Sequence, residues 1–410
     1  GWLHRSGTGG VYQDSAGNVG IASTQPKTRL DIGNGGFQVG PTGIATVTTV
    51  NTTNLINATP LSNRRVNING CMQIWQRSDN ATDIGGSNGY FACDRYRSSN
   101  NGSQRHSIIQ SSDTPNGFGY SMKIDVTTAN SSPSANNYVF IQHRLEGHDL
   151  QQFAKGSSDA KQYTLSFHVK SPKTGVHVVQ WEDVQNTRST SKSYTVSQAN
   201  TWEKHTITFD ADTTGVISND ITHRMQLYFW LMAGSTYNTG NVSDLATTWA
   251  GTGAASRASG QVNCFDSTDN DFYITGIQLE VGSVATPFEH RSYGDEFSRC
   301  GRYYQKIAEG NSKAIALCFH YSTTYSDWVL QYPMGAMRTN PSIDMVQGSN
   351  YYYLHGGTEN VYLDGAFIIE HGQVTQSNVY FDPDGGLTAG GTGYLKSNNN
   401  SAYLAISAEL

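Results

Sequence analysis

Charged residues are scarce in this chain. They make up 15% of its 410 residues, well below the roughly 25% of an average soluble protein. In their place the chain has 43 glycines and 23 tyrosines, together with many Ser, Thr and Asn residues that keep a surface hydrated through neutral groups. Such a surface is typical of extracellular particles and of proteins that face glycans.

Positive charge is scarcer still, with 27 Lys and Arg against 33 Asp and Glu and a net charge of −6. The sequence contains no basic cluster of the kind that neutralises phosphates, which argues against a nucleic-acid partner. Long apolar runs are also absent. The run Met225–Ala233 is far too short to cross a bilayer, so we expect no membrane insertion, and no signal peptide opens the sequence.

The cysteines are few, odd in number and widely scattered. They are Cys71, Cys93, Cys264, Cys300 and Cys318. Their spacing fits neither a disulfide framework nor paired zinc ligands. We therefore expect reduced cysteines that are mostly buried and behave as small hydrophobic residues.

Residues 1–62 consist of short β-branched pieces between Gly, Asn and Pro turns. No piece is long enough to bury a core by itself, so the segment is either a flexible linker or is ordered by packing against copies of itself. Its apolar content favours the second alternative, because a Gly/Ser linker would lack it. The apolar residues include Val19, Ile21, Leu30, Ile32, Phe37, Val39 and Ile44.

Residues 63–308 are dominated by alternation of apolar and polar residues. The strongest examples are residues 163–171, 204–211, 224–232 and 271–282. Clusters of Gly, Asn, Asp and Ser separate these runs, which predicts an antiparallel β-sandwich. Helical patterns are limited to residues 148–154 and 295–304. The long stretch 233–263 is rich in turn residues, and we expect a functional loop or an excursion packed on the sheet.

One alternating run needs an irregularity. Within residues 271–282, strict alternation cannot place Ile274, Ile277 and Leu279 on one face, so we expect a β-bulge near Gly276. At the end of the sandwich, two acidic residues are expected to pair with arginines, namely Glu280 and Glu289 with Arg291 or Arg302.

Residues 309–410 form another set of short alternating runs, the last of which reaches Leu410. They predict a second, smaller β-domain. The predicted fold class is therefore all-β, with a shaft-like N-terminal segment (1–62), a jelly-roll-like antiparallel β-sandwich (63–308) and a smaller C-terminal β tip domain (309–410).

The middle segment resembles the carbohydrate-binding-module-like sandwich of bacteriophage tail fibre and tail appendage proteins. The stretches that carry this resemblance are NINGCMQIWQR (67–77), FACDRYR (91–97), TLSFHVKSPKTGVHVV (164–179), NTWEKHTITFDADTTG (200–215) and FYITGIQLEVGSVATPFEHRSYGDEFSRCGRYYQK (272–306). The last is the most specific, because the order ITG, QLE, ATPFE and RYY recurs in that family as a unit.

Two further stretches resemble parts of phage fibres. GNVGIASTQPKTRLDI (17–32) is similar to a short module of fibre shafts, with Ala22 where the module commonly has Gly, and QYPMGAMRTNPSI (331–343) is similar to the tip domain that often follows the sandwich. The resemblance implies a homotrimer in the phage tail, outside the cell. It also implies that other virion proteins bind the N-terminus and that the fibre attaches to the surface polysaccharide of a bacterial host.

Aromatic residues are the main candidates for sugar contact, because the apolar face of a pyranose stacks on Trp or Tyr while its hydroxyls need polar partners. In the C-terminal segment they are Tyr351, Tyr352 and Tyr353 with His355 in one strand, and Trp328 and Tyr332 in another. Successive residues of a strand point to opposite faces, so at least one of the three tyrosines should be exposed. Packing in the core or in a trimer interface is the alternative for each residue.

The middle segment offers Trp181 and, in its long loop, Tyr237 and Trp249. Trp249 is also suited to plug the sandwich rather than meet a ligand. Three further tryptophans lie in alternating strands and are expected in the core: Trp75, Trp202 and Trp230.

A metal ligand set is suggested by the run DSTDND (266–271), which places Asp266, Asp269 and Asp271 close together. Carboxylate and carbonyl oxygens in a loop are ligands for Ca²⁺. The run lacks the Gly and the terminal Glu of an EF-hand, and a solvated turn is the alternative. We expect no cofactor, with Ca²⁺ as the open alternative.

The sequence has none of the usual catalytic motifs, such as GxSxG, HExxH, a Walker loop or GxGxxG after a strand. Glycan cleavage needs only two carboxylates about 5–10 Å apart, which Glu182 with Asp183, or Glu370 with a neighbour, would satisfy. Phage enzymes that cut polysaccharide usually sit on long parallel β-helices, whose repeated coils are absent here. We therefore expect a non-enzymatic adhesin, with a structural spacer and a depolymerase as alternatives.

Overall fold

The computed structural model describes residues 63–253, 256–356, 359–383 and 386–410. In the N-terminal segment it describes residue 15 and five short strands, all before residue 48. The chain divides into two compact units, Gly1–Leu61 and Ser62–Leu410. The described strands of the first unit form sheet A, in the order β1 (Val11–Gln13), β2 (Val19–Ile21), β3 (Leu30–Ile32), β4 (Phe37–Val39) and β5 (Ala45–Val47). Most of the 1–62 segment, Ile44 included, lies outside the described residues, and its predicted self-association stays a prediction.

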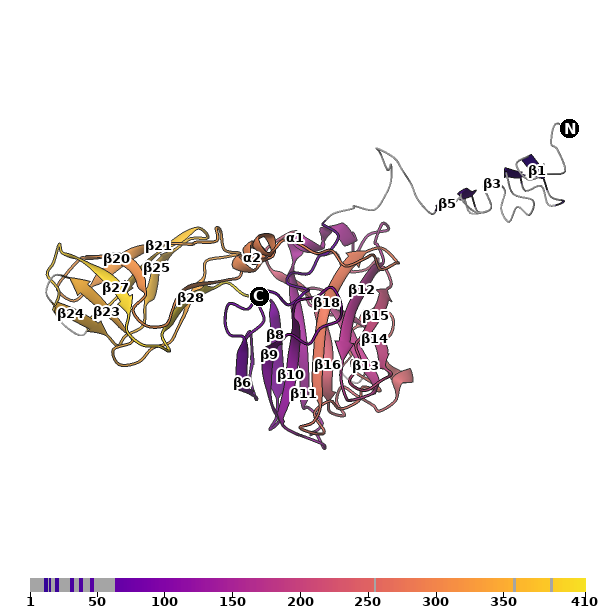
Figure 1. The fold of residues 1–410 in the computed structure, drawn as a ribbon, viewed down its shortest axis with the longest axis horizontal. Helices are drawn as coiled ribbons and strands as arrows, with labels where there is room; N and C mark the ends of the chain where they lie inside the picture. The colour runs from indigo at the N-terminus through magenta and orange to yellow at the C-terminus, as the bar shows by residue number, and fades with distance from the viewer. Residues whose placement is uncertain are drawn as a thin grey trace. The chain divides into compact units, whose positions relative to one another are not determined.

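Two antiparallel sheets form the sandwich of the second unit (Figure 1). Sheet B has the order β15 (Glu203–Phe209), β12 (Tyr163–Lys170), β18 (Asp271–Val281), β10 (Ser121–Thr128), β9 (Arg105–Ser111) and β6 (Asn80–Ile84). Sheet C has the order β17 (Ala250–Gly251), β14 (Arg188–Val196), β13 (Gly175–Asp183), β16 (His223–Ala233), β11 (Tyr138–Glu146), β8 (Tyr96–Asn101) and β7 (Asn88–Gly89). The predicted all-β sandwich is confirmed.

The core of the sandwich lies between sheets B and C. Leu165 and Leu279 from sheet B pack in one buried cluster with Trp181 and Phe229 from sheet C. Strand alternation explains why these residues meet, since every second side chain of each strand points to the same face. The long 233–263 stretch packs on the other face of sheet C, where its Leu245 joins a second buried cluster.

The bulge predicted near Gly276 is present. The register of β12 and β18 passes from Ser166–Gln278 to His168–Thr275, so two residues of β18 oppose one of β12. Gly276 has φ +65°, a left-handed conformation that costs glycine least. The shift places all three apolar residues of this run in the core: Ile274, Ile277 and Leu279.

Helices are few in the described residues. They are α1 (Gly147–Leu150), the 3₁₀ turns η1 (Gln151–Phe153) and η2 (Val242–Asp244), and α2 (Tyr293–Gly301). The first two and α2 fall where helical patterns were predicted. Within the part of the chain that the structure describes, no helix has the length and apolarity needed to cross a membrane. All five cysteines are buried and unpaired, as predicted.

The C-terminal part of the second unit, which was predicted as a tip domain and keeps that name below, is built from two more sheets. Sheet D has the order β19 (Tyr304–Glu309), β28 (Tyr403–Ser407) and β22 (Ser342–Met345). Sheet E has the order β24 (Glu359–Leu363), β23 (Tyr352–Gly356), β27 (Thr392–Ser397), β20 (Ala314–His320), β21 (Ser326–Gln331), β26 (Gln376–Phe381) and β25 (Ile368–Gly372). One face of sheet E packs with sheet D around a buried cluster that includes Leu354, Leu395 and Leu404.

The last residues of the chain bind the sandwich rather than continuing the strand. The prediction that the final strand reaches Leu410 is wrong, because β28 ends at Ser407. Beyond it, the carboxylate of Glu409 pairs with Arg95 and lies 3.2 Å from Arg77 Nη2. The guanidinium of Arg144 donates to the carbonyl of Leu410 at 2.5 Å.

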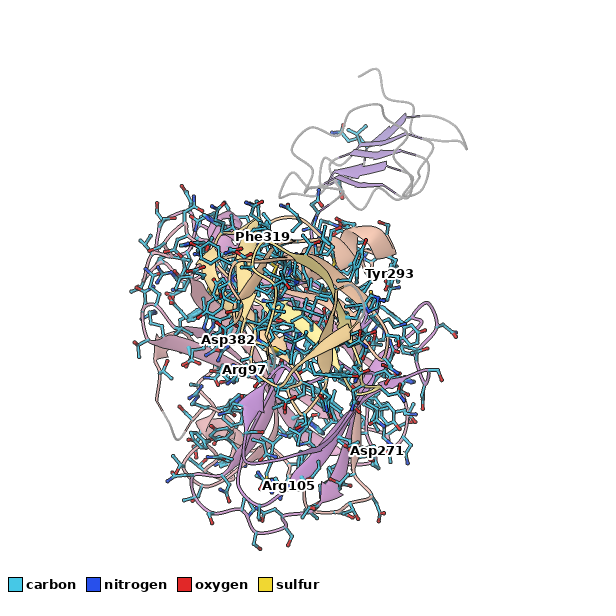
Figure 2. All side chains as sticks on the ribbon, turned by 90° about the vertical axis from the view of Figure 1, so that its left-hand side faces the viewer. Arg97, Arg105, Asp271, Tyr293, Phe319 and Asp382 are labelled. Carbon is cyan, nitrogen blue, oxygen red and sulfur yellow. The ribbon has the colours of Figure 1, made fainter. Side chains whose placement is uncertain are left out.

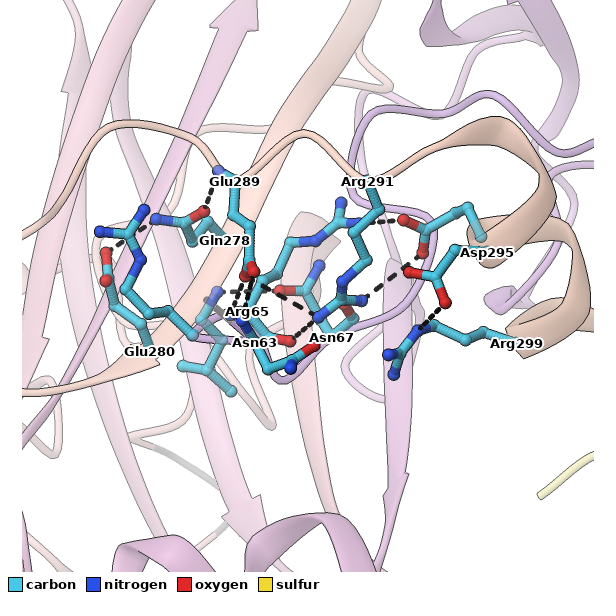
Figure 3. A network of polar contacts seen from close by, with 12 residues as sticks. Asn63, Arg65, Asn67, Gln278, Glu280, Glu289, Arg291, Asp295 and Arg299 are labelled. Carbon is cyan, nitrogen blue, oxygen red and sulfur yellow. Dashed lines mark hydrogen bonds and ion pairs between the residues drawn. The ribbon is translucent and has the colours of Figure 1, made fainter. Parts of the chain in front are cut away.

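A polar network joins the end of β18 to α2 (Figure 3). The carboxylate of Glu289 accepts hydrogen bonds from the backbone amides of Asn63 and Arg65, and its Oε2 lies 4.0 Å from Arg291 Nη2. The predicted pairing of Glu289 with Arg291 is therefore present. Glu280 accepts from neutral groups, among them the amide of Thr286 at 2.8 Å, rather than from an arginine.

Arg302 instead binds Glu146 on β11, with Nη2 2.8 Å from Oε2. The prediction that it pairs with Glu280 or Glu289 is therefore wrong.

Candidate functional site

Three of the aromatic residues predicted to bind sugar in the tip domain are buried. Trp328 is 5% exposed, and Tyr332 and Tyr352 are buried with it in the core between sheets E and D. The ring of Trp328 packs edge-on to Phe367 with centroids 5.3 Å apart. These side chains offer no ring face to a ligand, so their assignment as sugar contacts is wrong in this structure.

The rest of the tyrosine strand divides as alternation requires. Tyr353 and His355 lie on the outer face of sheet E, whereas Tyr351, just before β23, is half-buried against the core. Tyr353 lies beside Tyr362 of β24, with ring centroids 6.0 Å apart. The Nδ1 atom of His355 lies 2.8 Å from Oδ1 of Asn360. The prediction that at least one of the three tyrosines is exposed is wrong, because Tyr351 and Tyr353 are half-buried and Tyr352 is buried.

The two tryptophans proposed as ligands in the sandwich serve its packing instead. Trp181 is 0% exposed. Trp249 is half-buried against the core, its Nε1 donates to the carbonyl of Asp210 at 2.9 Å, and the Lys155 ammonium lies 5.1 Å from its ring centroid. Trp249 therefore plugs the sandwich, and the assignment of Trp181 as a sugar contact is wrong.

The three aspartates of the 266–271 run do not come together around a cation. Asp266 pairs with Lys173, and Asp271 lies 3.0 Å from Nζ of Lys123. Asp269 is exposed and accepts only from Ser267 at 3.5 Å. Within residues 63–253, 256–356, 359–383 and 386–410, no group of three or more His, Cys, Asp or Glu side chains is placed to share a metal ion. The calcium alternative thus has no ligand set here.

The outer face of sheet E carries an apolar and aromatic row that the sequence analysis missed. In β21 and β26, Trp328 and Val379 point into the core, so their neighbours Asp327 and Tyr380 lie on the outer face. Strand register aligns one residue from each of four adjacent strands: Phe319, Asp327, Tyr380 and Ile368. Phe319, labelled in Figure 2, is 49% exposed.

A hollow of about 540 Å³ includes Asp327 of this row in its lining. Its lining consists of Tyr321, Ser322, Tyr325, Asp327 and Glu370. Tyr321 is 74% exposed and meets Tyr325 edge-on with ring centroids 5.9 Å apart. Because this volume falls within the range of about 300–1,000 Å³ of small-ligand sites, it can hold part of an oligosaccharide.

The polar groups of the hollow are fixed by one another. The hydroxyl of Tyr325 donates to Oε2 of Glu370 at 3.0 Å. Partial burial and this carboxylate together raise the pKa of Tyr325 to about 12, so the hydroxyl stays protonated at neutral pH. The amide nitrogen of Asn378 lies 3.3 Å from Asp327 Oδ2 and 3.4 Å from Glu370 Oε2. Two carboxylates therefore face the hollow in a defined arrangement.

This arrangement combines the two features that sugar recognition needs. The exposed ring of Tyr321 offers an apolar surface to the C–H face of a pyranose, and the carboxylates of Asp327 and Glu370 accept hydrogen bonds from hydroxyls. Charge-assisted hydrogen bonds of this kind are stronger than neutral ones. Alternation in the sequence places Asp327 on the face opposite Trp328, but only the structure shows that Trp328 faces the core.

Sheet C carries a second polar array, but its groups are already bonded to one another. The amide of Gln142 donates to Gln226 at 2.8 Å, and Gln226 donates to Glu182 at 2.9 Å. Glu182 also accepts from Tyr228 and lies 3.1 Å from Nη2 of Arg257. The residues Gln142, Gln226 and Tyr228 are all buried. This array is closed upon itself, and the tip hollow is the better candidate.

Comparison with known proteins adds little to this geometry. No protein-family model matches the chain, and no curated protein matches it. Among solved structures, the enzymatically active domain of tailspike protein 4 from bacteriophage CBA120 is 12% identical, with TM-score 0.27 over 46% of this chain and 19% of that one. The matched region therefore spans less than a fifth of that tailspike structure.

Two carbohydrate-binding structures give similar values. A family 11 carbohydrate-binding module from Clostridium thermocellum, in complex with a β-1,3-1,4-mixed-linked tetrasaccharide, is 11% identical, with TM-score 0.26 over 51% of this chain and 99% of the module. A xylan-binding domain is 14% identical, with TM-score 0.25 over 47% of this chain and 90% of the domain. Likeness at this level is too slight to carry an inference about ligand or activity.

Proposed function

We propose that this chain is a non-enzymatic adhesin that binds glycans on a bacterial surface, as the receptor-binding part of a bacteriophage tail fibre. The observation that carries the proposal is the hollow in the tip domain, where the exposed ring of Tyr321 stands beside the carboxylates of Asp327 and Glu370. The sequence resemblance to tail fibre proteins supports the location in the virion, outside the cell.

The charge of the hollow selects among glycans. Its lining contains two acidic residues and no basic one, so uronic or sialic acids would meet like charge. We therefore expect the tip to favour neutral sugars or amino sugars over acidic ones. Salt should weaken this preference, because it screens the repulsion between exposed carboxylates and an acidic sugar.

The test is retention of the purified full chain on immobilised surface polysaccharides from a panel of bacteria, followed by a search for released fragments. Tyr321→Ala should weaken retention by roughly tenfold or more, as loss of a central aromatic contact does. The matched control is Tyr394→Ala, which removes an exposed tyrosine of β27 on the same outer face but outside the hollow. Equal loss in both variants would contradict a site centred on Tyr321.

Hydrolysis is a second candidate function, because Asp327 and Glu370 share one donor on Asn378. The two carboxylate oxygens lie 3.3 and 3.4 Å from the same nitrogen, which limits their separation to about 6.7 Å and admits the roughly 5–5.5 Å of retaining glycosidases. Release of fragments that stops in both Asp327→Asn and Glu370→Gln would establish a depolymerase. Retention without fragments supports the adhesin, and neither result across the panel would favour a structural fibre component.

Three chains acting together would strengthen a weak site. A homotrimer presents three tips, and several fibres per particle raise the effective concentration further. Light scattering on the 44.7 kDa chain tests the proposed trimer separately. A folded monomer would contradict the trimer and would leave the proposed sugar site in the tip domain unaffected.

A further inference from the structure

We propose that a second, independent glycan site lies where the sandwich meets α2 and β19, and that it takes a neutral saccharide. This inference rests on the proposed function, that the chain binds glycans, but it concerns different residues from those of the tip. The site is a hollow of about 500 Å³. Its aromatic lining comes from three separate segments: Trp75, Tyr120 and Tyr293.

The three rings are more open than packing requires. The sequence predicts Trp75 in the core, yet it is only half-buried, with one side against the sandwich core. Its Nε1 donates to the carbonyl of Met72 at 2.7 Å, which fixes the indole. Tyr293, the first residue of α2 and labelled in Figure 2, is 61% exposed, and Tyr120 is exposed as well. Exposed rings around one hollow are what a sugar face can cover.

The polar lining leaves an acceptor without a partner. The Oε1 atom of Gln73 is buried and accepts no hydrogen bond from the protein, although Gln73 lines the hollow. A buried polar atom without a partner costs about 1–3 kcal/mol, and a turn of the Gln73 amide toward the hollow would let a ligand hydroxyl remove that cost. Gln110 and Ser78 add further uncharged partners.

The charges of the lining balance, which points to an uncharged ligand. Arg77 and Lys306 are offset by Asp79 and Glu309. Both cations are engaged within the protein, because Arg77 Nη2 lies 3.2 Å from Glu409 and Lys306 Nζ lies 2.9 Å from Glu309. An anionic sugar would find no free cation here. A neutral hexose or N-acetylhexosamine needs none, since its hydroxyls and ring face match the lining.

The experiment uses the full chain labelled with 5-fluorotryptophan. The chain has seven tryptophans, and each gives its own ¹⁹F NMR signal. The signal of Trp75 is assigned with Trp75→Phe. The probes are the neutral oligosaccharides maltohexaose, cellohexaose, mannohexaose and chitohexaose. We expect at least one probe to move the Trp75 signal. The tip hollow has no tryptophan in its lining, so occupancy of the tip leaves that signal in place.

Two variants separate this site from the tip. Tyr293→Ala should weaken the binding seen at Trp75 by roughly tenfold and should leave the fold intact, because Tyr293 is 61% exposed. Tyr321→Ala should leave that binding unchanged while reducing retention through the tip.

The outcomes are distinct. If no probe moves the Trp75 signal at millimolar concentration, or if Tyr321→Ala abolishes the movement, the junction site is wrong while the tip proposal stands or falls on retention. Movement of the Trp75 signal without any retention that depends on Tyr321 would support the junction site and overturn the tip.

Discussion

Replacing Lys155 by Met should destabilise the sandwich strongly. Its ammonium nitrogen lies 2.5 Å from Asp183 Oδ2 and 3.0 Å from Asp212 Oδ2, and it donates to the carbonyls of Thr214 and Gly215 at 2.9 and 3.0 Å. The side chains of Lys155, Asp183 and Asp212 are 3%, 0% and 4% exposed. Methionine keeps the length of the side chain but leaves two buried carboxylates without this cation.

The magnitude follows from which partners remain. Although burial raises the pKa of Asp212, Arg188 and Lys155 lower it overall, and Arg188 still binds this carboxylate in the variant at 2.9 Å. Asp183 keeps only neutral donors, such as the side-chain amide of Asn186 at 2.8 Å. Loss of one partner of a buried pair costs about 3–5 kcal/mol, and we expect a value in this range.

Urea unfolding followed by tryptophan fluorescence measures this loss. With a slope of about 3 kcal/mol per molar, the midpoint should fall by at least roughly 1 M. Lys192→Met is the control, because Lys192 pairs with Asp210 at 3.3 Å on the surface and should cost less than about 1 kcal/mol. In the double variant Lys155→Met with Asp183→Asn, part of the stability should return. A midpoint for Lys155→Met equal to that of the control would refute the reasoning.

Three further predictions concern stability. Burial lowers the pKa of His106 from 6.5 to about 4. As the pH falls from about 6.5 to about 4, the unfolded state therefore binds a proton before the folded state does. The free energy of unfolding should drop by roughly 3 kcal/mol over this pH range. His106→Asn should show a smaller difference between urea midpoints at pH 7 and pH 4.5 than the unmodified chain. Gly276→Ala should lower the melting temperature, because φ is +65° and a Cβ would lie 2.7 Å from an aromatic ring, whereas Gly119→Ala, with nothing within 4 Å, should not. Glu409→Gln leaves the buried Arg95 without its carboxylate and should cost about 3 kcal/mol in the same urea assay; an unchanged midpoint would contradict that role.

Alternation in the sequence identified the strands β12, β15, β16 and β18 and the bulge at Gly276, because these depend on local patterns. It could not say which face of a strand is the core, since shifting the pattern by one residue exchanges the two faces. That ambiguity explains why Trp328 and Tyr352 were expected to bind sugar while Asp327 was overlooked. It also explains Trp202, which was expected in the core but is half-buried and donates to Asp113 at 2.9 Å.

Long-range pairing was equally hidden. The strands β24 and β27 lie in stretches rich in Gly and Asn and were not predicted. The hollow of the tip needs Tyr325 and Glu370, which are 45 residues apart, to meet through two strand pairings. Composition does not predict which distant residues meet in space. The same limit applies to the hollow where the sandwich meets α2 and β19, because its three aromatic rings come from three separate segments.

The contact between Arg95 and Glu409 joins residues 314 positions apart, and this separation has a consequence for synthesis. A ribosome adds about 5–20 residues per second. Glu409 is therefore synthesised roughly 15–60 s after Arg95, and Arg95 has no carboxylate partner from Glu409 during that time. During that interval the edge of the nascent sandwich that Glu409 will cover stays open to neighbouring chains. Folds dominated by such remote contacts also form slowly. Slower growth at low temperature, or an excess of chaperones, should therefore raise the soluble yield of this protein more than that of a helical protein of the same length.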